Sequence, residues 1–157
     1  MIAVYVRPIT EYCSSAWSPA YKSNIHLLEN VQHWFAKPLP GLKHLSYLSR
    51  LADLHIPTLE LIRLHTDLCL CYKIIKGLVN INLKELFTLA DCCNTTRGHS
   101  LKLIKPHARV NGRLFFYAVR IVDIWNSLPA DVIESGTYNL FKRRLYSVNL
   151  NEFLTVI

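Results

Sequence analysis

The amino-acid sequence predicts a mainly α-helical fold: an irregular helical domain with a short β element or extended loop near residues 98–112. Apolar residues recur every three or four positions in several separate stretches, which is the spacing of one buried helix face. The glycines stand at the ends of these stretches or between them, where a chain turns, at positions 41, 77, 98, 112 and 136. One domain over residues 1–157 is expected, because a chain of this length buries about two-thirds of the surface that its unfolded form exposes.

The first well-marked helix begins near Ser23, which is expected to cap it. Its apolar face is formed by Ile25, Leu28, Val31 and Phe35. The segment 37–41 contains two prolines and a glycine, and it ends this helix. A shorter helix is expected to follow, capped by Ser46 and running through Leu54.

The longest helix is expected to open at Thr58. Four apolar residues lie along one side of it: Leu61, Leu64, Leu68 and Ile75. Arg63 stands four residues before Asp67, a spacing that lets two side chains interact on a helix surface. Gly77 is well placed to be the C-terminal cap, since glycine readily adopts the left-handed conformation that ends helices.

The least helical part of the chain runs from Asp91 to Gly112. Apolar and basic residues alternate imperfectly between Ser100 and Lys105, which favours a short exposed strand.

Two further helices are predicted after this part. The first spans residues 113–128 and places on one face Leu114, Ala118, Ile121, Trp125 and Leu128. Its other face carries Arg120, Asp123 and Asn126, and Pro129 ends it. The second, Tyr138 to Val148, groups Phe141, Leu145 and Val148 and turns Lys142 and Arg143 outward.

Core packing is expected for all three tryptophans, Trp17, Trp34 and Trp125, because each has apolar neighbours in the sequence. The five cysteines make an odd number, which argues against a disulfide scaffold. Three of them lie in apolar helical patterns and are expected to behave as small core residues: Cys13, Cys69 and Cys71.

No apolar run approaches the roughly 18 residues needed to span a bilayer. The apolar start, residues 1–6, lacks the basic stretch and the cleavage pattern of a secretory signal. The expected compartment is intracellular, and the sequence does not distinguish nucleus from cytoplasm.

The net charge of +7 favours polyanionic partners, and its distribution is more informative than its size. Six basic residues occur without an intervening acid: Arg97, Lys102, Lys105, Arg109, Arg113 and Arg120. Such a cluster can neutralise phosphates and release counterions. Phe115, Phe116 and Tyr117 would offer stacking faces if they were exposed. The alternative is that the cations form a solvated face and the aromatic residues belong to the core.

Signals for catalysis are poor. The chain has no nucleophile elbow, no zinc-protease motif, no phosphate-binding loop and no dinucleotide fingerprint. No two acidic residues are adjacent, whereas polymerases hold two metal ions with closely placed carboxylates. Cys92, Cys93, His99 and His107 invite a zinc hypothesis, but adjacent cysteines do not easily aim both sulfurs at one tetrahedral ion. No cofactor is therefore expected.

Several short motifs occur in a particular order along the chain. A basic segment that begins at Thr96, Thr-Arg-Gly-His-Ser-Leu-Lys-Leu, leads into an aromatic helix that ends Ile-Trp-Asn-Ser-Leu-Pro at Pro129. The others are Arg7-Pro8, Glu11-Tyr12-Cys13, Trp17-Ser18-Pro19, Pro40-Gly41-Leu42 and the Asn-Leu-Phe-Lys-Arg-Arg-Leu segment at 139–145. With these motifs the chain resembles the C-terminal tail, thumb and post-thumb, of non-LTR (LINE-type, Jockey-like) retrotransposon reverse transcriptases. The resemblance covers nearly the whole chain, residues 4–145.

The resemblance implies an accessory role. The catalytic palm of such an enzyme would lie upstream, so this chain is expected to have no enzymatic activity on its own. It is expected to hold RNA or an RNA–DNA hybrid during target-primed reverse transcription. Motif matching implies contacts by Arg97, His99, Lys102 and Lys105, and more weakly by Lys142, Arg143 and Arg144; the basic run adds Arg109.

His99 has a second interpretation, in which it holds a turn by hydrogen bonding. The alternative for the whole chain is a non-enzymatic helical interaction module, or an inert relic of a decayed transposable element that self-associates through exposed apolar surface.

Overall fold

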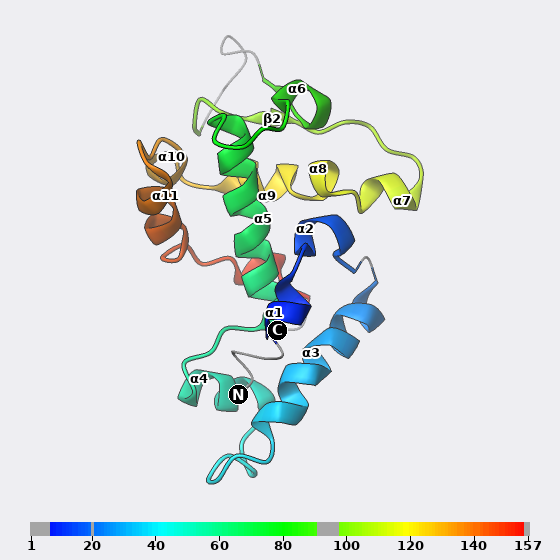
Figure 1. Cartoon of the computed structure of the whole chain (residues 1–157), viewed down its shortest axis with the longest axis vertical. Coiled ribbons are helices and arrows are strands. Elements are labelled where there is room, and N and C mark those ends of the chain that lie inside the picture. The colour runs from blue at the N-terminus through cyan, green and yellow to red at the C-terminus, as the bar shows by residue number, and fades with distance from the viewer. Residues whose placement is uncertain (1–6, 20, 91–97, 156–157) are drawn as a thin grey trace. The chain divides into compact units, whose positions relative to one another are not determined.

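The computed structural model describes residues 7–19, 21–90 and 98–155 (Figure 1). It is mainly helical and includes one small antiparallel sheet of two strands, so the predicted fold class is confirmed. The length predicts one domain, whereas the structure divides into two compact units. The first unit comprises residues 1–64 and 150–157, and the second comprises residues 65–149.

The first unit is built from short helices and one long one. They are α1 (Arg7–Glu11), α2 (Ser14–Trp17), α3 (Lys22–Ala36), α4 (Tyr47–Asp53), the beginning of α5 (Leu59–Ile75) and the 3₁₀ helix η3 (Asn151–Phe153). The prediction that Ser23 caps α3 is wrong, because Tyr21 occupies the cap position with an extended backbone. Ser46 caps α4 as predicted, and its hydroxyl accepts a hydrogen bond from the Ser49 N–H at 3.2 Å.

A buried carboxylate organises the start of α5. The Glu29 side chain of α3 accepts hydrogen bonds from the Tyr47 hydroxyl and from the backbone N–H groups of Leu59 and Glu60, the last two at 3.1 and 3.3 Å. These N–H groups have no partner within the helix, so a carboxylate is favourable at this position. The Thr58 hydroxyl accepts from the Leu61 N–H at 3.2 Å, which confirms the predicted start of the helix.

The C-terminal end of α5 is a Schellman motif. Gly77 has φ +65°, the Gly77 N–H donates to the Ile74 carbonyl at 3.1 Å, and the Leu78 N–H donates to the Lys73 carbonyl at 2.8 Å. This bond pattern requires a left-handed residue after the last turn, a conformation that costs glycine little. Gly77 is therefore the cap that the sequence predicts.

The second unit contains the rest of α5 and the remaining elements. They are α6 (Leu83–Leu86), β1 (Thr88–Leu89), β2 (Leu103–Ile104), α7 (Asn111–Leu114), α8 (Tyr117–Arg120), α9 (Val122–Ser127), α10 (Ala130–Ile133) and α11 (Tyr138–Leu145). Thr88 lies opposite Ile104 and Leu89 opposite Leu103. Strand β2 lies within the segment for which a short strand is predicted.

The region 113–128 departs from the predicted single helix. It is divided among α7, α8 and α9, because Phe116 has an extended backbone with ψ 142° that no α-helix accommodates. A second boundary falls at Ile121. Leu114 lies before the first break and is 38 % exposed, so the prediction that it shares a buried face with Ile121 and Trp125 is wrong.

The core of the second unit is aromatic. Trp125 is fully buried, and its indole N–H donates to the Leu101 carbonyl at 2.8 Å. The Tyr72 and Phe141 rings stack with centroids 4.1 Å apart. The predicted burial of four residues is confirmed: Leu68, Ile121, Trp125 and Phe141.

Other predictions of burial are wrong. Trp17 and Trp34, in the first unit, are 42 % and 69 % exposed. Leu61 and Leu64 are half-buried. Cys69 and Cys71 are buried as predicted, but Cys13 is exposed. Periodicity therefore identifies the core of the second unit better than that of the first.

Candidate nucleic-acid interface

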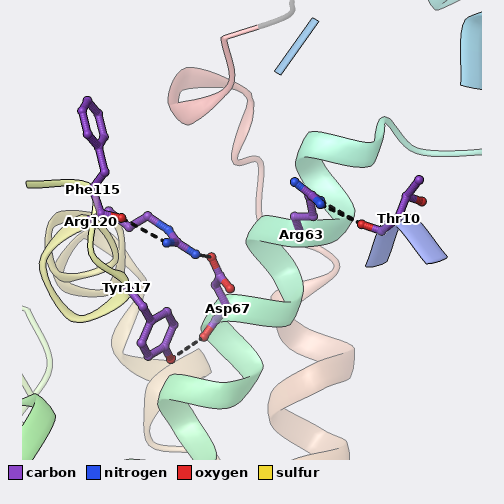
Figure 2. Close-up of polar contacts among 6 residues, drawn as sticks. All are labelled: Thr10, Arg63, Asp67, Phe115, Tyr117 and Arg120. Atoms are coloured by element: carbon purple, nitrogen blue, oxygen red, sulfur yellow. Dashed lines mark hydrogen bonds and ion pairs between the residues drawn. The ribbon is translucent and has the colours of Figure 1, made fainter. Parts of the chain in front are cut away.

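An ion pair joins α5 to α8 through Arg120, the last residue of the predicted basic run. Arg120 Nη2 lies 2.6 Å from Asp67 Oδ2, and Arg120 Nη1 donates to the Phe115 carbonyl at 3.2 Å (Figure 2). The Tyr117 hydroxyl donates to the Asp67 backbone carbonyl at 3.0 Å. Arg120 thus fixes the backbone at the break between α7 and α8. In the first unit, Arg63 donates to the Thr10 carbonyl at 2.8 and 3.2 Å (Figure 2), and its guanidinium lies 4.0 Å from the Trp17 ring centroid.

The segment that precedes this anchor is largely exposed, and we name residues 105–116 the basic loop. Arg109 and Arg113 are exposed, and the Arg109 Nε donates to His107 at 3.4 Å. Phe115 and Phe116 are 37 % and 51 % exposed, whereas Tyr117 is buried. Phe115 and Phe116 therefore offer ring surface in a segment with exposed arginines, whereas Tyr117 belongs to the core.

Two lysines of the predicted set have intramolecular interactions. Lys105 forms an exposed ion pair with Asp123. Lys102 is half-buried and passes close to Gly98. Gly98 has φ +104°, a backbone conformation that favours glycine. A Cβ atom there would lie 3.0 Å from Lys102 Cε, so the end of the lysine side chain would have to shift.

His99 does not suit a phosphate contact, which corrects its place in the predicted binding set. Its side chain is 1 % exposed, and Nε2 lies 3.1 Å from the Trp125 carbonyl oxygen. The ring meets Trp125 edge-on, with centroids 6.1 Å apart. Burial lowers the pKa of His99, and the Lys102 ammonium acts in the same direction. The turn-holding interpretation fits this geometry, since a buried neutral imidazole bonded to the backbone fixes the chain next to Gly98.

The three basic residues of α11 differ in their surroundings. Lys142 and Arg143 are exposed. Arg144 is half-buried and donates to the Asp131 carbonyl and to the Ser135 hydroxyl, the latter at 3.4 Å. Arg144 therefore joins α11 to the end of α10. The remaining predicted residue, Arg97, lies outside the described residues.

The sequence did not reveal the Asp67–Arg120 pair, whose members are far apart in the chain. The sequence indicates only that Asp67 and Arg120 have opposite charges and that each lies on a predicted helix. The sequence predicts Phe115 and Phe116 as stacking residues only if they are exposed. Their exposure depends on the helix break at Phe116, which the apolar periodicity does not show.

Metal binding finds no support among the residues that the structure describes, where no group of three histidine, cysteine or acidic side chains is placed to hold an ion. Cys92 and Cys93, two members of the zinc hypothesis, lie outside those residues. Within the same part of the chain, no helix combines the length and the apolar character needed to cross a bilayer.

Comparisons of this chain with protein-family models, with curated proteins and with solved structures find no match.

Proposed function

We propose that this chain is a C-terminal accessory part of a non-LTR retrotransposon reverse transcriptase, and that its basic loop contacts RNA or an RNA–DNA hybrid. The order of the sequence motifs supports the family. The observation that best supports the contact is that Phe115 and Phe116 are exposed in the same short segment as the exposed Arg109 and Arg113. No acidic residue lies within the basic loop.

Such a surface suits a polynucleotide for two physical reasons. Arginine neutralises phosphate and binds it through a planar set of donors, which releases counterions and makes affinity depend on salt. An exposed aromatic ring stacks on any base, which contributes about 1–3 kcal/mol per base without requiring a particular sequence. The Arg120 bond to the Phe115 carbonyl holds the backbone of this aromatic pair. Binding through the loop is therefore expected to be weak and largely independent of sequence.

The experiment is a salt titration of RNA binding by the full chain, followed by fluorescence anisotropy of a labelled single-stranded oligonucleotide. Removing one phosphate-binding cation should lower the slope of log affinity against log salt by about 0.7. Replacing Arg109 and Arg113 with Gln should therefore lower both the affinity and the slope. The matched control replaces Lys22 and Lys84, two exposed lysines outside the loop, with Gln. If both double substitutions changed the affinity and the slope equally, RNA binding would depend on net charge alone and the basic loop would not be the contact.

The same proposal implies no polymerase activity by this chain alone. The chain has no adjacent pair of acids that could hold two metal ions. Template-dependent primer extension by highly purified protein, above a mock preparation, would contradict this expectation.

A second candidate is the interaction module or relic. It is favoured by the apolar side chains that α3 leaves exposed, with Leu27 at 66 % and Trp34 at 69 %. A pocket of about 370 Å³ adjoins this helix and is lined by Trp34, Lys37, Pro38 and Lys43. Concentration-dependent self-association, abolished by Leu27→Ser with Trp34→Ser, together with undetectable RNA binding at low salt, would favour this candidate over the first.

A further inference from the structure

We propose that α5 and α11 form a second contact for single-stranded nucleic acid, separate from the basic loop, in which Lys73 and Lys142 bind phosphates and Tyr146 stacks on a base. We name Lys73, Tyr138, Lys142 and Tyr146 the α5–α11 stripe. The inference rests on the proposed nucleic-acid function but on different residues, so either site can fail without the other.

The stripe arises from matching periodicities on two helices. On α5, His65, Cys69 and Lys73 are spaced four residues apart. The same spacing relates Tyr138 and Lys142 of α11 to Tyr146, the C-cap residue of that helix. Residues at this spacing lie on one face of a helix. The two sets of residues pair in opposite order along the sequence. Lys73, the last of the α5 set, contacts Tyr138, the first of the other set, and His65 contacts Tyr146.

Cations and aromatic rings alternate along the stripe. Lys73 Nζ lies 4.4 Å from the Tyr138 ring centroid, and Lys142 Nζ lies 5.9 Å from the Tyr146 ring centroid. The His65 and Tyr146 ring centroids are 4.4 Å apart. Tyr146 is nevertheless 55 % exposed, so its ring is supported from within and still offers surface to a ligand. A ring held in this way loses little freedom when a base stacks on it.

Lys73 comes from α5, and Lys142 comes from α11. Burial raises the pKa of the Cys69 thiol, while the Lys142 and Lys73 ammonium groups act in the opposite direction. The Cys69 thiol and the Tyr138 hydroxyl also share a hydrogen bond.

The chain places no carboxylate close to these lysines in sequence. The stretches 68–84 and 135–149 contain Lys73, Lys76, Lys84, Lys142, Arg143 and Arg144, and neither contains Asp or Glu. Asp67, the acid just before the first stretch, forms the ion pair with Arg120. A polyanion with stackable bases is the ligand that satisfies both the cations and the rings, whereas an acidic peptide would use the cations alone.

The test compares matched variants of the full chain by anisotropy with a fluorescein-labelled twelve-nucleotide oligouridylate. Replacing Lys73 and Lys142 with Gln should lower the log–log salt slope by about 1.4, since each phosphate neutralised on a single strand contributes about 0.7. The control, Lys22→Gln with Lys84→Gln, removes the same charge from two exposed positions outside the stripe and should leave the slope within error. Tyr146→Ala should weaken binding at least about fivefold, and Tyr146→Phe should restore it. Circular dichroism should show unchanged helix content in each variant.

A second measurement uses the unsubstituted chain and so does not depend on how the variants fold. Photocrosslinking with an oligonucleotide that carries 5-iodouridine, followed by peptide mass spectrometry, should label Tyr146 or Tyr138. Labelling confined to Phe115 and Phe116, with a salt slope unaffected by the lysine substitutions, would overturn the second contact and leave the basic loop in place. Labelling of the tyrosines alone, with no effect of the Arg109 and Arg113 substitutions, would overturn the basic loop as a contact and leave the α5–α11 stripe in place. Absence of any binding by the unsubstituted chain at low salt would overturn both.

Discussion

Asp67 and Arg120 form an ion pair that is largely enclosed: the side chain of Asp67 is 5 % exposed and that of Arg120 is 21 % exposed. Desolvation makes such a pair costly to assemble, but removal of one member leaves the other buried without its counter-charge. In this chain the pair also carries the bond from Arg120 to the Phe115 carbonyl, so it connects α5 to the backbone of the basic loop.

Arg120→Met should destabilise the second unit by about 3 kcal/mol, the lower end of the range for breaking a buried pair, because Arg120 is partly exposed. Methionine retains a long apolar side chain, so the loss of stability reflects the missing guanidinium. Urea denaturation measures this loss. Lys105→Met is the matched control, since the exposed Lys105–Asp123 pair should contribute less than about 1 kcal/mol. Similar midpoints for the two variants would show that the Asp67 pair contributes no more than a surface pair.

Trp125→Ala should cost about 3–5 kcal/mol, because it empties the centre of the aromatic core and leaves the Leu101 carbonyl without its indole donor. Trp34→Ala removes the same side chain from a position that is 69 % exposed and should change stability little. Chemical denaturation followed by circular dichroism compares the two variants. A negligible shift for Trp125→Ala would place this residue outside the core.

Stability should fall as the pH falls from about 7 to about 5. Burial lowers the pKa of both His65 and His99 below the ordinary value of 6.5, so the unfolded chain binds more protons than the folded chain in this range. The contribution is fully present above the unfolded pKa and is lost as the pH approaches the folded pKa. Neither ring nitrogen of His65 has a hydrogen-bond partner among the described residues.

Urea midpoints at a series of pH values measure this loss, and His65→Gln should make the dependence shallower. The matched variant is His44→Gln, which replaces an exposed histidine of the first unit. A pH dependence that is equally steep in the unsubstituted chain and in both variants would assign the effect to other groups.

Gly77→Ala should destabilise the chain by about 1 kcal/mol, because the φ of +65° strains any residue with a Cβ atom although no neighbour occupies that space. Gly136→Ala is the control, since its Cβ would also meet nothing and its backbone is not in the left-handed region. Thermal denaturation should separate the two variants. A Gly77→Ala variant as stable as Gly136→Ala would mean that the Schellman motif relaxes at no cost.

Much of the fold could be predicted from local signals. Caps and breakers act over a few residues, which is why Ser46, Thr58 and Gly77 were identified correctly, and the strong periodicity of α5 and α9 identified Leu68 and Trp125 as core. The prediction of a single helix over residues 113–128 is wrong because the apolar pattern continues across Phe116. Arg120 bonds to the Phe115 carbonyl at the break and pairs with the distant Asp67, and the apolar pattern shows neither contact.

The candidate sites were predicted less well, because exposure depends on long-range packing. Motif matching places His99 in the nucleic-acid-binding set, yet its ring lies buried against Trp125. Trp34 looked like core, yet α3 leaves it exposed. Lys73 and Tyr138 are separated by 65 residues and meet only in the folded chain, although the four-residue spacing within each helix was visible in the sequence.

The Glu29 carboxylate restricts which amino acids position 29 can tolerate during evolution. Donors approach both of its oxygens: the Tyr47 hydroxyl and the Leu59 N–H reach Oε1, and the Glu60 N–H reaches Oε2. Glutamine has nearly the same shape but offers only one acceptor oxygen, so its NH₂ group would face an N–H or O–H donor. Aspartate keeps both acceptors on a shorter stem. Related chains that keep this junction of α3, α4 and α5 should therefore retain glutamate at this position, and a change there should be accompanied by changes in the residues that donate to it.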